Sequence, residues 1–240
     1  MDRTPWEQLD IILANRPAVH RPGTERDPTR WSEEGVRAGD RTCFGVSKPF
    51  AHDLLSRLMT GMHTLETGSG VSTLVFALGG VRHTAISPDA DEHAELRAYA
   101  GSLGIDMTTV SLVPEPSDRY LPACDLNGLD VVFLDGKHAF PWPMVDWFYT
   151  ADRLKVGGLM ILDDTQLRPV RVLEDFLVSD VDRWRFEGRP GGRTSIFRKL
   201  AHPVHDTTWK MQPWAARWHS GPLWRRWVRR MLGRRGRQTP

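Results

Sequence analysis

Carboxylates follow two short apolar segments of the chain, and this placement suggests ligand chemistry. Asp135 comes directly after residues 131–134, and Asp163 and Asp164 come directly after residues 157–162. Uninterrupted apolar runs of this length are typical of strands buried on both faces of a parallel sheet. Because the carboxyl ends of such strands lie at one ligand-binding edge, the three carboxylates are predicted to converge there as hard oxygen ligands.

A simpler interpretation gives these aspartates a structural role. Asp164 or Thr165 could cap a helix that begins near Arg168. A cap explains one aspartate and leaves the others unexplained, so ligand binding is the interpretation we favour.

A third predicted strand breaks into a glycine-rich turn with the sequence LETGSGVST, residues 65–73. A dinucleotide-binding loop requires a third glycine where Thr73 stands, which disfavours a nicotinamide cofactor. Glu66 precedes the first glycine by two residues and could accept a hydrogen bond from the ammonium group of a cofactor. The alternative is that Gly68 and Gly70 only turn the chain between a strand and a helix.

Strands and helices alternate along most of the chain, and their order predicts the architecture. Strands are expected near residues 62–66, 82–87, 108–113, 129–135, 157–163, 182–188 and 193–199. Helices are expected near residues 72–79, 89–103, 143–154 and 168–178. The fold class is therefore α/β: a Rossmann-like, seven-stranded, mostly parallel sheet with helices on both faces and a C-terminal antiparallel hairpin.

Two further helices are expected before the first strand. Residues 4–15 begin with a capping box formed by Thr4 and Glu7, and a helix near residues 48–60 follows Ser47 as its cap. The predicted divisions of the chain are an N-terminal arm with a short helix (1–46), an α/β domain (47–200) and a basic tail (201–240).

Composition limits the class of protein. The 240 residues can bury a full core, and no apolar stretch approaches the length of a membrane span. The N-terminus is charged and has no apolar signal core, so we expect a cytoplasmic location. Cys43 and Cys124 have no metal-type spacing and suit a reducing compartment as free thiols.

The net charge of +2 conceals an asymmetry between the body and the tail. Residues 209–240 carry nine Lys and Arg and no acidic residue, which leaves residues 1–208 with a formal charge of −7. This acidic body argues against specific nucleic-acid binding by the whole protein. In the tail, tryptophans and arginines fall on opposite faces of a predicted helix, and this pattern favours contact with an anionic membrane through residues 209–235. Docking onto the acidic body and a solvated terminus are the alternatives.

The order of a strand, Glu66-Thr67-Gly68-Ser69-Gly70, Asp135, the Asp163–Asp164 pair and a terminal hairpin resembles class I S-adenosylmethionine-dependent methyltransferases. Residues 47–200 look most similar to the metal-dependent O-methyltransferases, of the catechol, caffeoyl-CoA and bacterial sugar-modifying types. The resemblance implies S-adenosylmethionine as cofactor. The implied cofactor-binding residues are Glu66, Gly68, Ser69, Gly70, Ser117, Asp118 and Asp135, with Ser117 and Asp118 near the adenine.

The resemblance also implies a metal and a base. Asp135, Asp163 and Asp164 stand at the family's Mg²⁺ ligand positions, where a metal would lower the pKa of a substrate hydroxyl and orient it. His138 stands where the family carries its general base, and the ordinary histidine pKa of about 6.5 suits that role. Lys137 would need strong desolvation to serve instead, and a loop histidine is often only a surface residue.

One position departs from the family. Ala85 stands where an acidic residue usually holds the ribose hydroxyls, and Asp89 is the nearby carboxylate that could replace it. In the loop after His138, Phe140 and Trp142 could either form a wall of the acceptor site or cover the edge of the sheet.

The function predicted from the sequence is therefore an O-methyltransferase, assisted by a divalent metal and acting on a hydroxyl of a small molecule or glycan. A non-catalytic cofactor-binding or scaffold protein on the same fold is the main alternative, and Ala85 is the residue that supports it. A nucleotide-linked oxidoreductase is disfavoured by the missing glycine. A homodimer and a peripheral position at the inner membrane face are further expectations.

Overall fold

The computed structural model describes residues 3–17, 45–202 and 212–215, and the chain divides into two units, residues 1–203 and 204–240. In the second unit, residues 212–215 form a turn in which the Ala215 N–H donates to the Gln212 carbonyl over 3.1 Å. Cys43 and nearly all of the tail predicted to contact membranes lie outside the described residues. Within the described part, no helix combines the length and the apolar character needed to cross a bilayer.

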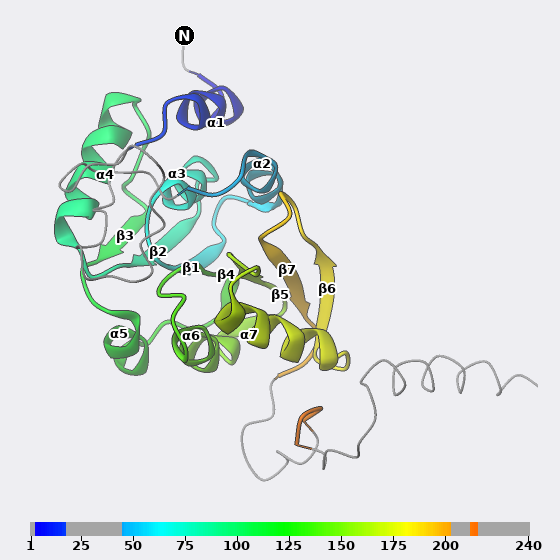
Figure 1. Ribbon diagram of the computed structural model, residues 1–240. Helices are drawn as coiled ribbons and strands as arrows, with labels where there is room; N and C mark the ends of the chain where they lie inside the picture. The colour runs from blue at the N-terminus through cyan, green and yellow to red at the C-terminus, as the bar shows by residue number, and fades with distance from the viewer. Residues whose placement is uncertain (1–2, 18–44, 203–211, 216–240) are drawn as a thin grey trace, which may run out of the picture. The chain divides into compact units, whose positions relative to one another are not determined.

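The first unit is built on a seven-stranded sheet with the order β3-β2-β1-β4-β5-β7-β6 (Figure 1). The strands are β1 His63–Thr67, β2 Arg82–Ile86, β3 Val110–Val113, β4 Leu129–Leu134, β5 Leu154–Leu162, β6 Trp184–Gly188 and β7 Ser195–Lys199. The first five pair in parallel, and β7 runs antiparallel between β5 and β6. The predicted Rossmann-like sheet with a terminal antiparallel hairpin is confirmed.

Helices cover both faces of the sheet, with α1 to α4 on one side and α5 to α7 on the other (Figure 1). The helices are α1 Pro5–Ala14, α2 Lys48–Arg57, α3 Val71–Leu78, α4 Ala90–Ser102, α5 Ser117–Ala123, α6 Trp142–Ala151 and α7 Arg168–Ser179. Alternate residues of the central strands point to opposite faces, so Phe133 and Ile161 enter one core while Val132 and Met160 enter the other. These strands are therefore buried on both faces, as their apolar sequences predict.

The N-terminal helices begin where their caps predict. In α1 the Thr4 N–H donates to Glu7 Oε2 over 2.8 Å, and the Glu7 N–H donates to the Thr4 hydroxyl over 3.3 Å. Ser47 caps α2. Leu9 and Ile12 of α1 are fully buried in the same core as α2 and α3, so this helix packs onto the α/β domain.

Several elements differ from the sequence-based expectation: β5 begins at Leu154 rather than at residue 157, and α6 ends at Ala151 rather than at residue 154. Helix α2 ends at Arg57 rather than at residue 60, because Leu58 is already extended, with φ −78° and ψ 139°. Helix α5, Ser117–Ala123, was not predicted. It is short and contains Pro122, and its buried residue Leu121 packs in the core beneath α6 and α7, so tertiary contacts stabilise a segment with weak helical periodicity.

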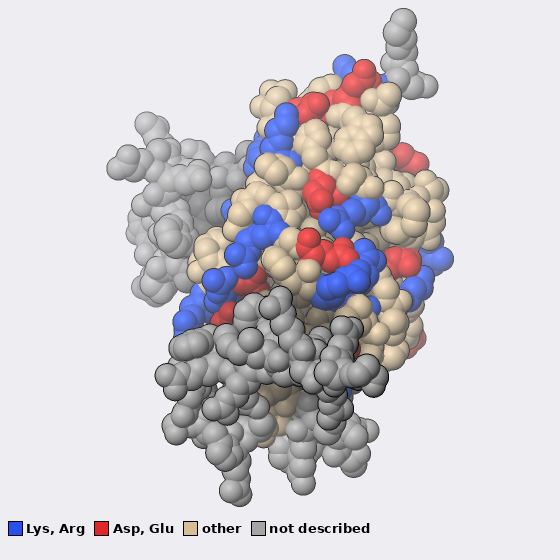
Figure 2. All heavy atoms as spheres, turned by 90° about the vertical axis from the view of Figure 1, so that its right-hand side faces the viewer, with Lys and Arg blue, Asp and Glu red and all other residues tan. Residues whose placement is uncertain are grey.

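An ion cluster ties α2 to the terminal hairpin. Figure 2 shows basic and acidic side chains side by side on the face that carries β6. Glu187 of β6 accepts from the guanidinium groups of Arg198, Arg57 and Arg185, over 2.5, 3.1 and 3.1 Å. Arg198 contributes most to holding the pKa of Glu187 at about 2, burial opposes this effect, and Arg185 and Arg57 reinforce it.

We expect this cluster to make part of the stability depend on pH. Because the folded pKa of Glu187 lies below the ordinary value of 4.5, its contribution is complete above pH 4.5 and is lost as the pH falls toward 2. Glu187→Gln should therefore flatten the fall in the free energy of unfolding between about pH 6 and about pH 3, measured by urea denaturation. Glu115→Gln, at an exposed glutamate outside the cluster, should behave as the wild type; the same slope in Glu187→Gln would contradict the assignment.

Candidate functional site

The ends of three strands lie in one row and create the functional edge of the sheet. Thr67 of β1 pairs with Leu134 of β4, and Leu134 pairs with Leu162 of β5. The residues that follow these three positions, Gly68, Asp135 and Asp163, consequently emerge at the same level. The sequence-based expectation that the glycine turn and the carboxylates share one edge is met by this register.

The turn after β1 requires glycine at its first glycine position. Gly68 has φ +96°, and a Cβ at this residue would lie 2.5 Å from the carbonyl oxygen of Asp135. The Gly68 N–H donates to the Ile86 carbonyl over 2.8 Å, and the Asp135 N–H donates to the Thr67 carbonyl over 3.0 Å. The turn is thus pressed directly against the end of β4, and any side chain at Gly68 would push the two apart.

Glu66 lies beneath this turn and is fully buried. Its Oε1 accepts from the Thr73 hydroxyl, and that hydroxyl accepts from the Gly70 N–H over 2.9 Å. On β2, His83 Nε2 lies 3.1 Å from the same carboxylate oxygen. These partners make Glu66 a brace for the glycine turn, and its Oε2 has no hydrogen-bond partner among the described residues. The expected contact of Glu66 with a cofactor ammonium stays a prediction.

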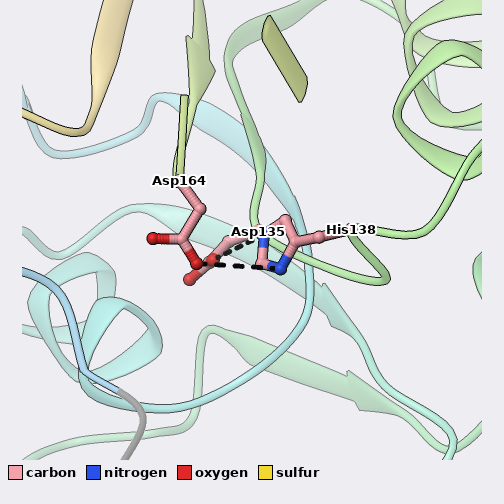
Figure 3. A group of neighbouring side chains, drawn as sticks. All are labelled: Asp135, His138 and Asp164. Carbon is pink, nitrogen blue, oxygen red and sulfur yellow. Dashed lines mark ion pairs between the residues drawn. The ribbon is translucent and has the colours of Figure 1, made fainter. Parts of the chain in front are cut away.

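A second group forms where β4 and β5 end (Figure 3). His138 Nε2 lies 3.5 Å from Asp135 Oδ1, and His138 Nδ1 lies 3.7 Å from Asp164 Oδ2. One ligand atom from each of the three residues falls within 4.8 Å of the others, and all three side chains are partly exposed. The group could share a cation or a proton with a molecule that reaches the edge of the sheet.

The surroundings of Asp135 and His138 raise the pKa of both groups. Burial, reinforced by the charge of Asp163, raises the pKa of Asp135 to about 7, although His138 opposes the shift and the side chain keeps 24% of its surface exposed to screening solvent. Burial lowers the pKa of His138, but Asp135, Asp164 and Asp163 together raise it above its ordinary value. His138 is therefore a stronger base than an isolated histidine.

Asp163 is not a member of the group, which differs from the expected ligand set. Its carboxylate is almost completely buried; Oδ1 accepts from the Thr194 hydroxyl and Oδ2 lies 3.3 Å from Arg193 Nη2. Successive side chains at a strand end point in opposite directions, and Asp164 then turns the chain with φ +53°. The three-residue group that the structure brings together contains His138 where the sequence predicted Asp163.

The residues around His138, from Lys137 to the start of α6, indicate which side chain can serve as the base. Lys137 Nζ lies 3.8 Å above the ring of Trp142, so its charge is engaged with an aromatic face. Phe140 has 70% of its surface exposed and therefore does not cover the sheet. This geometry favours His138 over Lys137 as the base and leaves Phe140 accessible beside the site.

The segment expected near the adenine also reaches this edge. Ser117 begins α5. Its hydroxyl and that of Thr67 both favour the charged form of the carboxyl group of Asp146 on α6. Burial raises the pKa of Asp146 to about 6, and the two hydroxyls oppose the shift. The charge of Asp118 raises the pKa further. Sequence reasoning missed Asp146, since an aspartate inside an apolar helix gave no sign of its partners.

The ribose position remains unusual in the structure. Ala85 is buried and pairs with Glu66 across β1 and β2. Asp89, the expected substitute, caps α4: its Oδ1 accepts from the N–H groups of Asp91 and Glu92 over 2.9 and 3.2 Å. Its role toward a ribose stays a prediction.

Comparisons with known proteins agree with this fold. Residues 65–165 match a family described as a methyltransferase domain, and no curated protein matches the chain. Three methyltransferases are among the solved structures that are similar to this chain. The O-methyltransferase TomG of Streptomyces achromogenes, in complex with SAM, has 17% identity and a TM-score of 0.53, with 68% of this chain and 84% of that chain covered.

A methyltransferase from Geobacter sulfurreducens has 19% identity and a TM-score of 0.54, with 65% of this chain and 80% of that chain covered. An rRNA methylase from Streptococcus thermophilus has 16% identity and a TM-score of 0.51, with 65% and 99% covered. Residues 65–165 therefore form a methyltransferase domain, and the sheet around them has the fold of the class I, S-adenosylmethionine-dependent methyltransferases. An enzyme of this class is what the resemblance predicted.

The close approach of Gly68 to Asp135 yields a test of the cofactor turn. S-adenosylhomocysteine should raise the melting temperature of the wild type by binding the native state, and Gly68→Ala should abolish that shift because the new Cβ displaces the turn. Gly104→Ala is the matched control: Gly104 also has positive φ, +68°, but nothing lies within 4 Å of its added Cβ. It should lose stability by roughly 1 kcal/mol and keep the full ligand shift. An unchanged ligand shift in Gly68→Ala would exclude this turn as the cofactor site.

Proposed function

We propose that this protein is an S-adenosylmethionine-dependent O-methyltransferase that acts on a hydroxyl group of a small molecule or glycan. The observation that carries the proposal is the position of His138, partly exposed between Asp135 and Asp164 and beside the glycine turn. S-adenosylmethionine, when bound, supplies an electrophilic methyl group. The chain must supply a base and an orientation for the acceptor oxygen.

His138 supplies the base. Its imidazole would take the hydroxyl proton of the acceptor while the oxygen bonds to the methyl carbon and the carbon–sulfur bond breaks to release S-adenosylhomocysteine, and the flanking carboxylates would stabilise the resulting imidazolium. Asp135 and Asp164 flank the ring, 3.5 and 3.7 Å from its two nitrogens. Fixing the acceptor close to the methyl group contributes much of the rate in such a transfer.

A divalent ion fits part of this site. The oxygens of Asp135 and Asp164 are of the kind Mg²⁺ prefers, and a bound ion would lower the pKa of the acceptor hydroxyl. His138 cannot hold the ion and accept the proton with one nitrogen, and Mg²⁺ prefers oxygen. We therefore propose the two carboxylates as ligands and His138 as the base.

The nature of the acceptor follows from charge and exposure. The acidic body of the chain disfavours a polyanionic acceptor, although one of the similar structures is an rRNA methylase. TomG, another similar structure, is an O-methyltransferase. Phe140 follows His138 by two residues and offers an exposed ring, which suits an acceptor with an apolar face. Membrane contact through residues 209–235, a peripheral cytoplasmic position and a homodimer remain proposals from the sequence.

A non-catalytic scaffold on the same fold is the alternative, and Ala85 is the residue that favours it. Against it, the fold retains a partly exposed basic group, His138, whose pKa is raised by three carboxylates, a feature that a scaffold does not need.

The first test of the proposed function is directed at the base. S-adenosylhomocysteine formation would be followed with a panel of phenols, catechols and sugars as acceptors. His138→Gln should lower kcat by about 10²- to 10⁴-fold and leave the melting shift with S-adenosylhomocysteine intact. His63→Gln, at the opposite end of β1, is the control and should retain full activity. Equal activity in both variants would contradict the role of His138.

The second test is directed at the metal. Excess EDTA should abolish turnover, and Mg²⁺ or Mn²⁺ should restore it, because Asp135 and Asp164 lie close enough to share an ion. Asp164→Asn should need more metal for half-maximal activity. Full activity in excess EDTA would exclude metal assistance and leave His138 as the sole activating group.

A further inference from the structure

Arg193 lies across the two aspartates that follow β5. Its Nη2 is 3.3 Å from Asp163 Oδ2, and its Nη1 is 3.4 Å from Asp164 Oδ1. Arg193 belongs to the turn between β6 and β7, and because β7 returns antiparallel beside β5, this turn lies at the edge where β5 ends. A fixed positive charge therefore stands next to the carboxylates of the site.

Arg193 is held in place by hydrogen bonds of both its backbone and its side chain. The Arg193 carbonyl accepts from the N–H and the hydroxyl of Thr165, over 2.9 and 2.8 Å. Its Nη2 also donates to the Gly45 carbonyl over 2.7 Å. Only 37% of the side chain is exposed. These contacts position the charge before any ligand arrives.

The packing of the turn reinforces this position. A Cβ on Gly191, which has φ +72°, would lie only 1.8 Å from the Ser47 hydroxyl oxygen at the start of α2. The β6–β7 turn is thus in close contact with the segment that leads into α2. This contact fixes the backbone near Arg193 against the start of α2.

The consequence concerns Asp163. Both of its oxygens are engaged, one with the Thr194 hydroxyl and the other with Arg193, and the carboxylate is buried. It cannot bind a cation unless Arg193 leaves. Arg193 also lies beside Asp164, where its charge opposes the approach of a second cation.

We propose that the Arg193 guanidinium serves as a fixed positive charge beside Asp163 and Asp164. It prevents Asp163 from coordinating a metal and weakens the affinity of the site for divalent ions. The inference deepens the proposed function, since it concerns the same site. It assigns Arg193 as a positioning residue that sets how strongly a metal is retained, leaving Asp135 and Asp164 as the accessible carboxylates.

The test measures Mn²⁺ binding by electron paramagnetic resonance of the free ion, without any turnover. Arg193→Met removes the charge at similar length and should tighten Mn²⁺ binding by roughly tenfold or more. The double variant Arg193→Met/Asp163→Asn should lose the part of this gain that comes from the released Asp163 and keep the part that comes from removing the charge beside Asp164. Arg193→Lys, which keeps a positive charge, should show a smaller gain.

A matched control removes another arginine from the same hairpin. Arg185→Met breaks a contact with Glu187 and should leave Mn²⁺ affinity unchanged. Cooperative thermal melting of each variant checks that it is folded. An Arg193→Met protein that is folded and binds Mn²⁺ no more tightly than the wild type would overturn the proposal.

Two single variants keep the proposal testable if Arg193→Met does not fold. In an otherwise wild-type chain, Asp164→Asn should weaken Mn²⁺ binding, whereas Asp163→Asn should have little effect. Equal losses in the two variants would show that Asp163 is a ligand and would reject the proposal. Absence of methyl transfer together with the expected Mn²⁺ results would reject the proposed function and leave the role of Arg193 standing.

Discussion

The parallel register of β1, β4 and β5 is the constraint on which the site depends. It sets Thr67, Leu134 and Leu162 in one row, so that the three loops that follow must share the space beyond them. The absence of a side chain at Gly68 allows the first loop to lie against the second. A residue with a Cβ there would push the glycine turn away from Asp135, and so away from the group that Asp135 forms with His138 and Asp164.

Charge balance at this edge is the second requirement. Three carboxylates that follow parallel strands repel one another; burial is the main cause of the raised pKa of Asp135, and the charges of Asp163 and Asp164 add to it. His138 and Arg193 oppose this repulsion from different sides, one through a partly exposed ring and the other through a fixed guanidinium. The terminal hairpin therefore does more than extend the sheet, because its turn delivers the compensating charge.

The polar groups beneath the glycine turn are buried, whereas His138 and its neighbouring carboxylates are partly exposed. Glu66, Thr73 and His83 form a linked set within the core, and Ala85 lies next to them on β2. The Thr73 hydroxyl donates to Oε1 of this buried carboxylate and His83 Nε2 lies close to the same oxygen, which offsets part of the cost of burial. The rigid support of the turn is thus separated from the reactive groups at the rim.

The sequence by itself determined the sheet, its hairpin, the glycine turn and the edge where Asp135 and His138 lie, because strand periodicity, caps and strand-end carboxylates are local signals. Only the tertiary structure decided which side chains meet. It placed His138, and not Asp163, in a group with Asp135 and Asp164. It brought Asp146 close to Ser117. It also placed Arg193 against residues about thirty positions earlier in the chain. Such pairings depend on strand order and on the direction in which each side chain leaves its strand, and neither is encoded in any short segment.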